Sequence, residues 1–391
     1  MEWKHYKMDE LIEEISMGPF GSDVKKEFYV DNGVPILNGS NLQGFKLQED
    51  SFGYLTKEKA DSLKKCNAHR GDIIVTHRGT LGQIVYVPVD SKYDRYVISQ
   101  SQFRFRCKAD LVDVQYLVYY FHTREGQYKI LANASQVGVP ALARATSTFR
   151  LIDIKLPPLD DQRRIASILS SLDRKIELNN KINADLEEMA QAIFKNWFVD
   201  FEPFKNGKFV NSELGMIPEG WKVGCLGDIA EITSGKRPPK KSKDKTKELF
   251  IPLIGASDIM GFTSDVLYER PILVIGRVGT HGVVQRFQEK CWPSDNTLVI
   301  ESRYYNYVYQ LLKGIDYSAI NRGSTQLLIT QTDVKNTDVI IAPENVLKEY
   351  ESITSTLFSK HRANIKENSR LSLLRDTLLP RLMSGELEVP E

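Results

Sequence analysis

Residue types that often carry catalysis are present in this chain, but they do not occur at catalytic spacings. The four cysteines lie at least 41 residues apart, so no CxxC pair is available for a structural zinc ion. The six histidines form no HExxH motif, no GxxxxGK[ST] or GxSxG sequence occurs, and no GxGxxG follows a predicted strand. The Asn/Asp-Pro-Pro-Tyr sequence that an amino-methyltransferase needs around a flipped base is also missing. We therefore expect a binding protein with no catalytic residue and no metal site.

Positive charge is concentrated in residues 236–247, which contain seven cations and one anion. Two prolines and the absence of apolar periodicity predict a loop here. Such a loop can lie along a phosphate backbone, and a solvated flexible loop is the alternative that stays open. The candidate DNA contacts in this segment are Lys236, Arg237, Lys240 and Lys241.

Arginines and threonines, several beside glycine turns, are further candidate DNA contacts. Arginine can pair with guanine through two hydrogen bonds. The candidates in the first half of the chain are Arg78, Thr80, Arg104, Arg106 and Arg144, and those in the second half are Arg277, Thr280, Arg286 and Arg322. We expect Arg78, Arg144, Arg277 and Arg322 on one DNA-facing side. A surface salt bridge is the alternative for each arginine.

The elements that must position these residues occur twice. Residues 34–45 read VPILNGSNLQGF and residues 251–262 read IPLIGASDIMGF, an offset of 217. The offset is 200 between Gly79-Thr80 and Gly279-Thr280, and 185 between Asp153 and Asp338. Insertions thus fall between matching blocks, as in loops on a shared scaffold.

Each copy is predicted to contain a globular α/β part. Runs of apolar and β-branched residues predict the strands, and apolar residues at helical spacing predict the helices. The first copy has predicted strands near 34–38, 72–76, 83–87 and 102–106 and a helix near 113–123. The second has predicted strands near 250–254, 271–276 and 297–301 and a helix near 304–313.

A long helix is predicted to follow each globular part. Residues 160–198 contain no Gly or Pro, and residues 344–383 are interrupted only by Pro380. In the first helix a 4-3 apolar stripe runs from Ile165 to Trp197, as in a coiled-coil seam. The stripe is Ile165, Leu169, Leu172, Ile176, Asn179, Asn183, Leu186, Ala190, Ile193 and Trp197.

Asparagines on this seam are candidates for setting the register of the helix pair. Asn179 and Asn183 map onto Asn364 and Asn368 at the offset of 185. A buried Asn in a seam costs stability but fixes register. Two alternatives stay open. The seam could instead run through Ile168, Leu172, Ile182, Leu186 and Met189, leaving the asparagines in solvent, or the helix could be a core helix of one domain.

Length and composition agree with a multidomain soluble protein. At 391 residues, the chain is long enough for two or three domains. The apolar fraction is 41%, the charged fraction is 26% and the net charge is +1, which excludes a wholly basic histone-like protein. No stretch of about 18 apolar residues could span a membrane, and the first residues lack the apolar stretch of a secretory signal. We therefore expect a cytoplasmic protein with no membrane partner.

Long motifs resemble the specificity subunits of type I restriction–modification systems. Residues 156–166 (LPPLDDQRRIA) and 172–179 (LDRKIELN) resemble the first central repeat of that family, and residues 189–201 continue the match. Residues 214–221 (LGMIPEGW) resemble the entry to its second target-recognition domain. The later blocks are represented by residues 323–326 (GSTQ) and 378–385. In the first copy, residues 138–142 (GVPAL) replace GSTQ, so we expect the two domains to read different sequences.

The resemblance implies an α+β fold with two target-recognition domains separated by two long antiparallel helices. The implied segments are residues 1–155 and 205–341 for the recognition domains, and 156–204 and 342–391 for the helices. Such subunits read a bipartite double-stranded DNA site and dock two methyltransferase subunits. These in turn recruit motor-nuclease subunits.

The resemblance also implies that the chain itself performs no chemistry and binds no cofactor. S-adenosylmethionine and ATP with Mg²⁺ are expected on the partner subunits. The main alternative is a duplicated DNA-binding or scaffold module unrelated to restriction. A methyltransferase fused to its own recognition domains is the second, although two recognition copies and two long helices leave no room for a catalytic fold.

Overall fold

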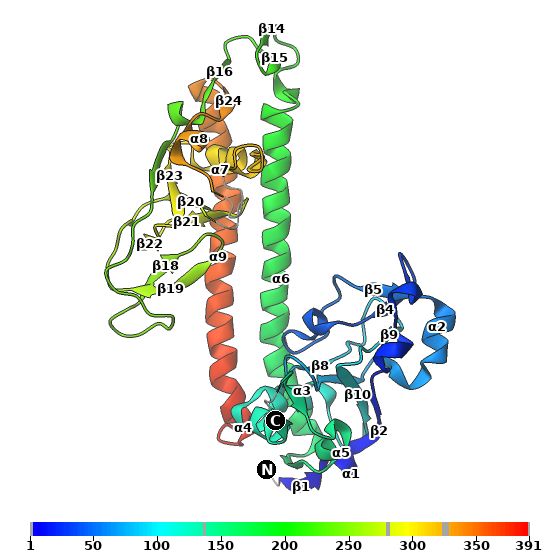
Figure 1. Cartoon of the computed structure of the whole chain (residues 1–391). Coiled ribbons are helices and arrows are strands. Elements are labelled where there is room, and N and C mark those ends of the chain that lie inside the picture. Colours follow the sequence, from blue (N-terminus) through cyan, green and yellow to red (C-terminus); the bar gives the residue numbers. More distant parts are fainter. Residues whose placement is uncertain (1–2, 136–137, 279–281, 323–327, 390–391) are drawn as a thin grey trace. The chain divides into compact units, whose positions relative to one another are not determined.

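The computed structural model describes residues 3–135, 138–278, 282–322 and 328–389. The chain forms two compact units. The first unit combines Met1–Leu178 with Glu367–Glu391, and the second is Asn179–Lys366. Each unit contains one globular part and a piece of both long helices, so the units cut across the four segments implied by the sequence (Figure 1).

The first unit is built on two main sheets. Its four-stranded antiparallel sheet has the order β2-β10-β7-β8, with bounds Ile12–Met17, Gln102–Cys107, Ile73–Thr76 and Ile84–Tyr86. Its five-stranded sheet has the order β3-β5-β4-β9-β6, with bounds Tyr29–Val30, Gly53–Leu55, Val34–Ile36, Arg95–Val97 and Asn67–His69. Two further strand pairs are β1 (Lys4–Lys7) with β13 (Asp153–Leu156), and β11 (Ala134–Ser135) with β12 (Ala141–Leu142). The helices are α1 (Met8–Leu11), α2 (Lys57–Ser62), α3 (Val114–His122), α4 (Arg124–Leu131) and α5 (Ala145–Arg150).

The second unit repeats this plan with fewer strands. Its four-stranded antiparallel sheet has the order β17-β23-β20-β21, with bounds Glu231–Ser234, Thr297–Glu301, Ile272–Gly276 and Val284–Phe287. A three-stranded sheet has the order β19-β18-β22, with bounds Ile259–Thr263, Ile251–Ile254 and Trp292–Pro293. The remaining pairs are β16 (Lys222–Cys225) with β24 (Asp338–Ile341), and β14 (Phe209–Ser212) with β15 (Gly215–Pro218). The helices are α7 (Tyr305–Gly314) and α8 (Gln331–Lys335).

The predicted strands and helices are all found within a few residues of their expected positions. The equivalent strands β7 and β20 consist mainly of apolar, β-branched residues, and every residue in them is buried, which is why the sequence identified them. The four-stranded sheets have matching strand order in both units, and β4–β9 and β18–β22 are the equivalent parallel pairs. The internal duplication predicted from the sequence is therefore confirmed at the level of topology.

The two long helices are α6 (Leu159–Phe198) and α9 (Glu344–Met383), and they run antiparallel within each unit. In the first unit, Arg375 Nη1 donates to Asp173 Oδ1 at 2.6 Å, and the start of α6 shares a core with the end of α9. In the second unit, Asn364 Nδ2 donates to Asn183 Oδ1 at 2.9 Å. The fold is thus α+β with an internal repeat and a long helix between the two globular parts.

The stripe predicted along α6 is the buried one. Each of its ten members is buried or half-buried, including Asn179 and Asn183. The alternative seam is wrong, because Ile168 and Met189 on that face are 36% and 51% exposed. The core-helix alternative is also wrong, because α6 divides between the two units.

The partner asparagines differ in burial: Asn364 is buried and Asn368 is half-buried. Their role in fixing register stays a prediction. Among the described residues, no helix is long and apolar enough to cross a membrane. Within the same residues, no group of three or more His, Cys, Asp or Glu side chains could hold a metal ion.

Candidate nucleic-acid interface

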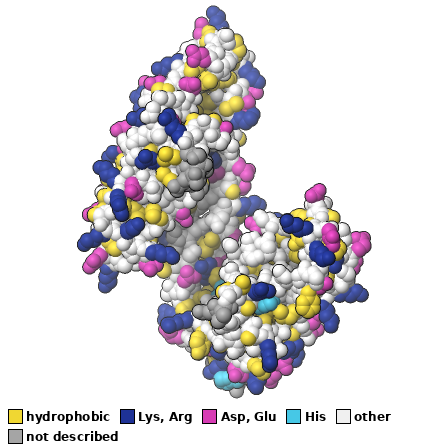
Figure 2. All heavy atoms as spheres, viewed as in Figure 1, with side chains coloured by type: hydrophobic (Ala, Val, Ile, Leu, Met, Phe, Trp, Pro, Cys, Tyr) yellow, Lys and Arg dark blue, Asp and Glu magenta, His cyan; other side chains and the backbone are white. Residues whose placement is uncertain are grey.

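The basic loop of residues 236–247 joins β17 to β18 and is anchored by its backbone. Lys236 N donates to Pro293 O at 3.0 Å, and Lys236 O accepts from Trp292 Nε1 at 2.7 Å. Ser242 exchanges two backbone hydrogen bonds with Phe262, at 2.9 and 2.8 Å. All seven cations are exposed, and none forms an ion pair within the described part of the chain. Figure 2 shows Lys and Arg side chains gathered over the end of this unit that carries β18 and β19.

In the first unit, hydrogen bonds between two loops bring predicted residues together. Leu142 N donates to His77 O at 2.8 Å, and Gly79 N donates to Pro140 O at 2.9 Å. Arg78, Thr80 and Arg144 are all exposed on these loops. Burial lowers the pKa of His77, so its imidazole adds no charge near neutral pH. This surface can therefore offer two arginines and a hydroxyl to DNA.

The equivalent loops of the second unit bring Arg277 and Arg322 together. Ile329 N donates to Arg277 O at 3.0 Å, and Arg322 N donates to Leu328 O at 2.9 Å. Arg322 is exposed, and its guanidinium pairs with Asp333, so part of its charge is already neutralised. Thr280 lies outside the described residues.

Arg104 requires a correction, because it lies inside the first unit. It is 3% exposed, and its guanidinium donates to Glu14 at 2.7 Å, to Asp72 at 3.2 Å and to Lys65 O at 3.0 Å. Arg106 pairs with the other oxygen of the same buried Asp72 carboxylate. A buried carboxylate needs such partners, which explains two arginines on one strand. We remove Arg104 from the candidate DNA contacts.

Arg286 also packs inside the second unit and is therefore not a candidate DNA contact. Its guanidinium lies 3.5 Å from the ring centre of Phe358 and 4.6 Å from that of Tyr309. Arg286 Nη2 donates to Asn306 Oδ1 at 2.7 Å. Burial lowers the pKa of this guanidinium, although arginine stays charged near neutral pH.

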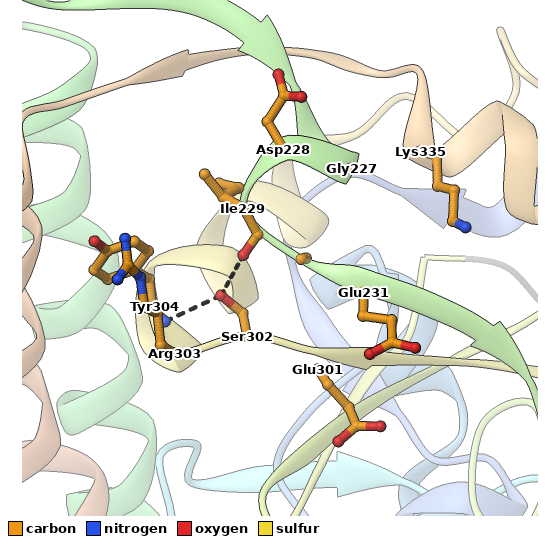
Figure 3. Close-up of a pocket in the computed structure, with 10 residues that line it drawn as sticks. Gly227, Asp228, Ile229, Glu231, Glu301, Ser302, Arg303, Tyr304 and Lys335 are labelled. Atoms are coloured by element: carbon orange, nitrogen blue, oxygen red, sulfur yellow. Dashed lines mark hydrogen bonds between the residues drawn. The ribbon is translucent and has the colours of Figure 1, made fainter.

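A pocket of about 620 Å³ in the second unit lies where β17 and β23 pair, and its lining mixes the acidic Asp228, Glu231 and Glu301 with the basic Arg303 and Lys335 (Figure 3). Glu231 and Glu301 are directly paired neighbours on these strands, so their carboxylates project to the same side. Ser302 Oγ donates to Ile229 O at 2.7 Å and closes one wall. Glu301 is paired with Arg270, so the lining carries no excess of positive charge to attract phosphate, and we do not place DNA here.

One feature that the sequence interpretation missed is a turn shared by both units, Ser99–Gln102 and Ser294–Thr297. In the first, Gln102 N donates to Ser99 O at 3.1 Å, and in the second Thr297 N donates to Ser294 O at 3.0 Å. The carbonyl of the third turn residue accepts from the loop that carries the candidate arginine. Ser101 O accepts from His77 N at 2.9 Å, and Asn296 O accepts from Arg277 N at 2.8 Å. The sequence contains one signal for this turn: in each unit a serine stands three residues before the first residue of the next strand, β10 or β23.

Comparison with known proteins identifies the family. Residues 1–188 and 218–370 match the family model described as the type I restriction modification DNA specificity domain. The chain is 30% identical over 422 residues to the type I restriction enzyme MjaIX specificity subunit of Methanocaldococcus jannaschii, covering 100% of this chain and 94% of that protein. It is 22% identical to the HindI specificity subunit of Haemophilus influenzae, covering 99% of this chain and 100% of that protein.

A solved structure supports the fold. The type I restriction-modification S subunit from M. genitalium superposes with a TM-score of 0.62 at 17% identity, covering 97% of this chain and 96% of that one. The matches extend over both globular parts and both long helices. The chain therefore belongs to the family of DNA specificity subunits of type I restriction–modification systems.

Proposed function

We propose that this chain reads a bipartite site on double-stranded DNA, with one half-site contacted by each unit. The observation that carries the proposal is the framework of hydrogen-bonded loops that occurs in both units. Each framework presents arginines, and the second adds the unpaired cations of residues 236–247. Arginine and lysine at such positions provide both phosphate attraction and contacts to base edges.

We further propose two similar docking faces for two methyltransferase subunits. Ile168 on α6 and Ile353 on α9 are 36% and 39% exposed, and Met189 and Leu374 are 51% and 47% exposed. Both pairs are separated by the repeat offset of 185, and each unit holds one residue from each pair. Exposed apolar residues at equivalent places favour two copies of one partner.

In this proposal the catalytic work belongs to the partners. S-adenosylmethionine binds to the methyltransferase subunits, and ATP with Mg²⁺ binds to the motor-nuclease subunits that they recruit. This chain contributes DNA binding and the separation of the half-sites, and it binds neither cofactor.

The DNA-reading proposal is tested by mapping methylated bases in cells that express the partner subunits with and without this chain. We expect a two-part motif with a fixed gap only when the chain is present. A continuous motif, or the same methylation without the chain, would contradict the proposal.

The docking proposal is tested by the stoichiometry of the purified complex. Ile168→Asp with Leu374→Asp should remove one methyltransferase subunit, and Met189→Asp with Ile353→Asp should remove the other. The matched control is Ser355→Asp, an exposed polar position on α9 that lies two residues from Ile353 and therefore on a different face of the helix. Two bound subunits in every variant would exclude these faces.

A further inference from the structure

The shared turn is held by the same set of backbone hydrogen bonds in both units. Besides the bonds described above, the fourth carbonyl accepts from a glycine amide, from Gly18 N at 2.8 Å and from Gly235 N at 3.0 Å. A Cβ atom on Gly18 would lie 1.9 Å from Ser99 O, and one on Gly235 would lie 2.1 Å from Ser294 O. These approaches are too close for any side chain, so both turns depend on glycine in the neighbouring segment.

The two turns differ in chemistry at their tips and at their fourth residue, which is buried Gln102 in the first and buried Thr297 in the second. The tip residues are Gln100 and Ser101 in the first unit, and Asp295 and Asn296 in the second. Gln100, Asp295 and Asn296 are exposed, and within the described residues their side chains make no hydrogen bond to protein. Ser101 is half-buried, and its hydroxyl lies 2.9 Å from that of Ser99. A fixed backbone with variable polar tips is what a shared recognition scaffold requires.

A crevice beside the second turn places this tip next to the basic loop. Its volume is about 400 Å³, and its lining includes Arg237 and Lys241 of the basic loop together with Asp295 and Asn296 of the turn. Ser294, which is 3% exposed, lines the crevice, and its buried hydroxyl has no partner among the described residues. Cations for phosphate thus lie beside unpaired groups that can pair with base edges.

We propose that these tips read bases, Gln100 in the first half-site and Asp295 with Asn296 in the second. An Asn or Gln amide pairs with adenine N6 and N7, and an Asp carboxylate accepts from cytosine N4. The second half-site should therefore contain adenine and cytosine, and the first should contain adenine. This inference rests on the proposed DNA-reading function and names its specificity-determining residues.

The test uses the complex with its methyltransferase subunits and the methylated motif of the wild-type protein. Competition binding with duplexes carrying every single-base change measures discrimination at each position. Asn296→Ala should reduce discrimination at one base pair of the second half-site by roughly tenfold or more and leave the first half-site unchanged. Gln100→Ala should reduce discrimination at one base pair of the first half-site and leave the second half-site unchanged. Asn211→Ala is the matched control, because Asn211 is exposed on the hairpin strand β14.

Amide hydrogen exchange verifies that each variant keeps its fold. Weaker binding with unchanged discrimination at every position would overturn the inference, as would a change in the opposite half-site. If the wild-type protein reads no two-part motif, the proposed function itself fails. A two-part motif whose discrimination survives Asn296→Ala, Asp295→Ala and Gln100→Ala would overturn only the inference.

Discussion

The two units share a loop framework but differ in the charge of the segment that follows the first strand of the four-stranded sheet. In the second unit this segment contains residues 236–247, with seven cations and one anion. In the first unit, residues 19–33 contain two lysines and three acidic residues, and Lys25 lies 3.9 Å from Glu27. Exposed Phe20 stands where the repeat places Arg237. The scaffold is therefore common to both copies, whereas the exposed cations of this segment are concentrated in the second.

The units also differ in how the recognition domain is attached to the helices. In the first, Arg375 of α9 lies 4.9 Å from the ring centre of Phe45, a residue of the globular part. In the second, Arg286 of the globular part stacks on Phe358 of α9. The cation therefore comes from α9 in the first unit and from the globular part in the second. In both units the cation–π contact joins the globular part to α9.

The largest expected effect comes from lengthening the two long helices between the domains. Inserting four residues after Ile176 and four after Leu371 adds about 6 Å of helix, somewhat under two base pairs of DNA at about 3.4 Å each. One turn is 3.6 residues, so the seam stays nearly in phase. We expect a longer gap in the methylated motif and two unchanged half-sites. A changed half-site with the original gap would show that the helices do not set the spacing.

The next effect sharpens the comparison of the two attachments. Phe358→Ala should destabilise the second unit by about 3 kcal/mol, because the ring is buried against Arg286 and Tyr309. Phe45→Ala should cost the first unit about half as much, because Phe45 is only half-buried. Amide exchange measured separately in α7 and α3 gives both values. Equal loss of protection in the two helices for either variant would refute this unit-specific attachment.

A smaller effect tests the difference in charge. Lys240→Ala with Lys241→Ala should lower the slope of log affinity against log salt by roughly 2, at nearly 1 per phosphate contact. The matched variant of the first unit, Lys25→Ala with Lys26→Ala, should change the slope less, because Lys25 already has a carboxylate neighbour. DNA binding by the complex is measured across a salt series. If affinity and slope are unchanged by the Lys240 and Lys241 variant, the basic loop is excluded.

The smallest effect concerns pH. Burial lowers the pKa of His122 in the first unit, and burial lowers that of His361 in the second, where Glu187 only partly offsets it. An unfolded chain therefore binds these protons more readily, so stability falls as the pH drops through about 6.5. His122→Gln should reduce this pH dependence in α3 and leave it unchanged in α7, and His361→Gln should do the reverse. Amide exchange at pH 7.5 and 5.5 measures both, and identical profiles for all three proteins would refute the assignment.

Elements with a strong local pattern were predictable from the sequence. In α6, β7 and β20 the spacing of apolar residues is set by neighbours only a few positions apart in the sequence, so the pattern can be recognised without tertiary contacts. The exposed cations of residues 236–247 were predictable for the same reason, because charge and proline content are local.

The rest of the candidate site depends on contacts that are distant in sequence. Arg104 is interior because Asp72 lies 32 residues away on the chain and is buried beneath it. The turn at Ser99–Gln102 gains its rigidity from Gly18 and His77, which no local pattern connects to it. Composition could therefore suggest arginines as DNA contacts, but only tertiary contacts separate the interior ones from those on the surface.

The division of the chain between the units has a consequence for its synthesis. The core of the first unit includes Leu379, Leu382 and Met383 from the end of α9, together with Ile165 and Leu169 from the start of α6. On a ribosome that adds about 5–20 residues per second, residues 1–178 would wait roughly 10 to 40 s for these partners. The second unit is one continuous segment and needs no such wait. We therefore expect the domain that is translated first to be the one completed last, with its apolar surface open to chaperones in the interval.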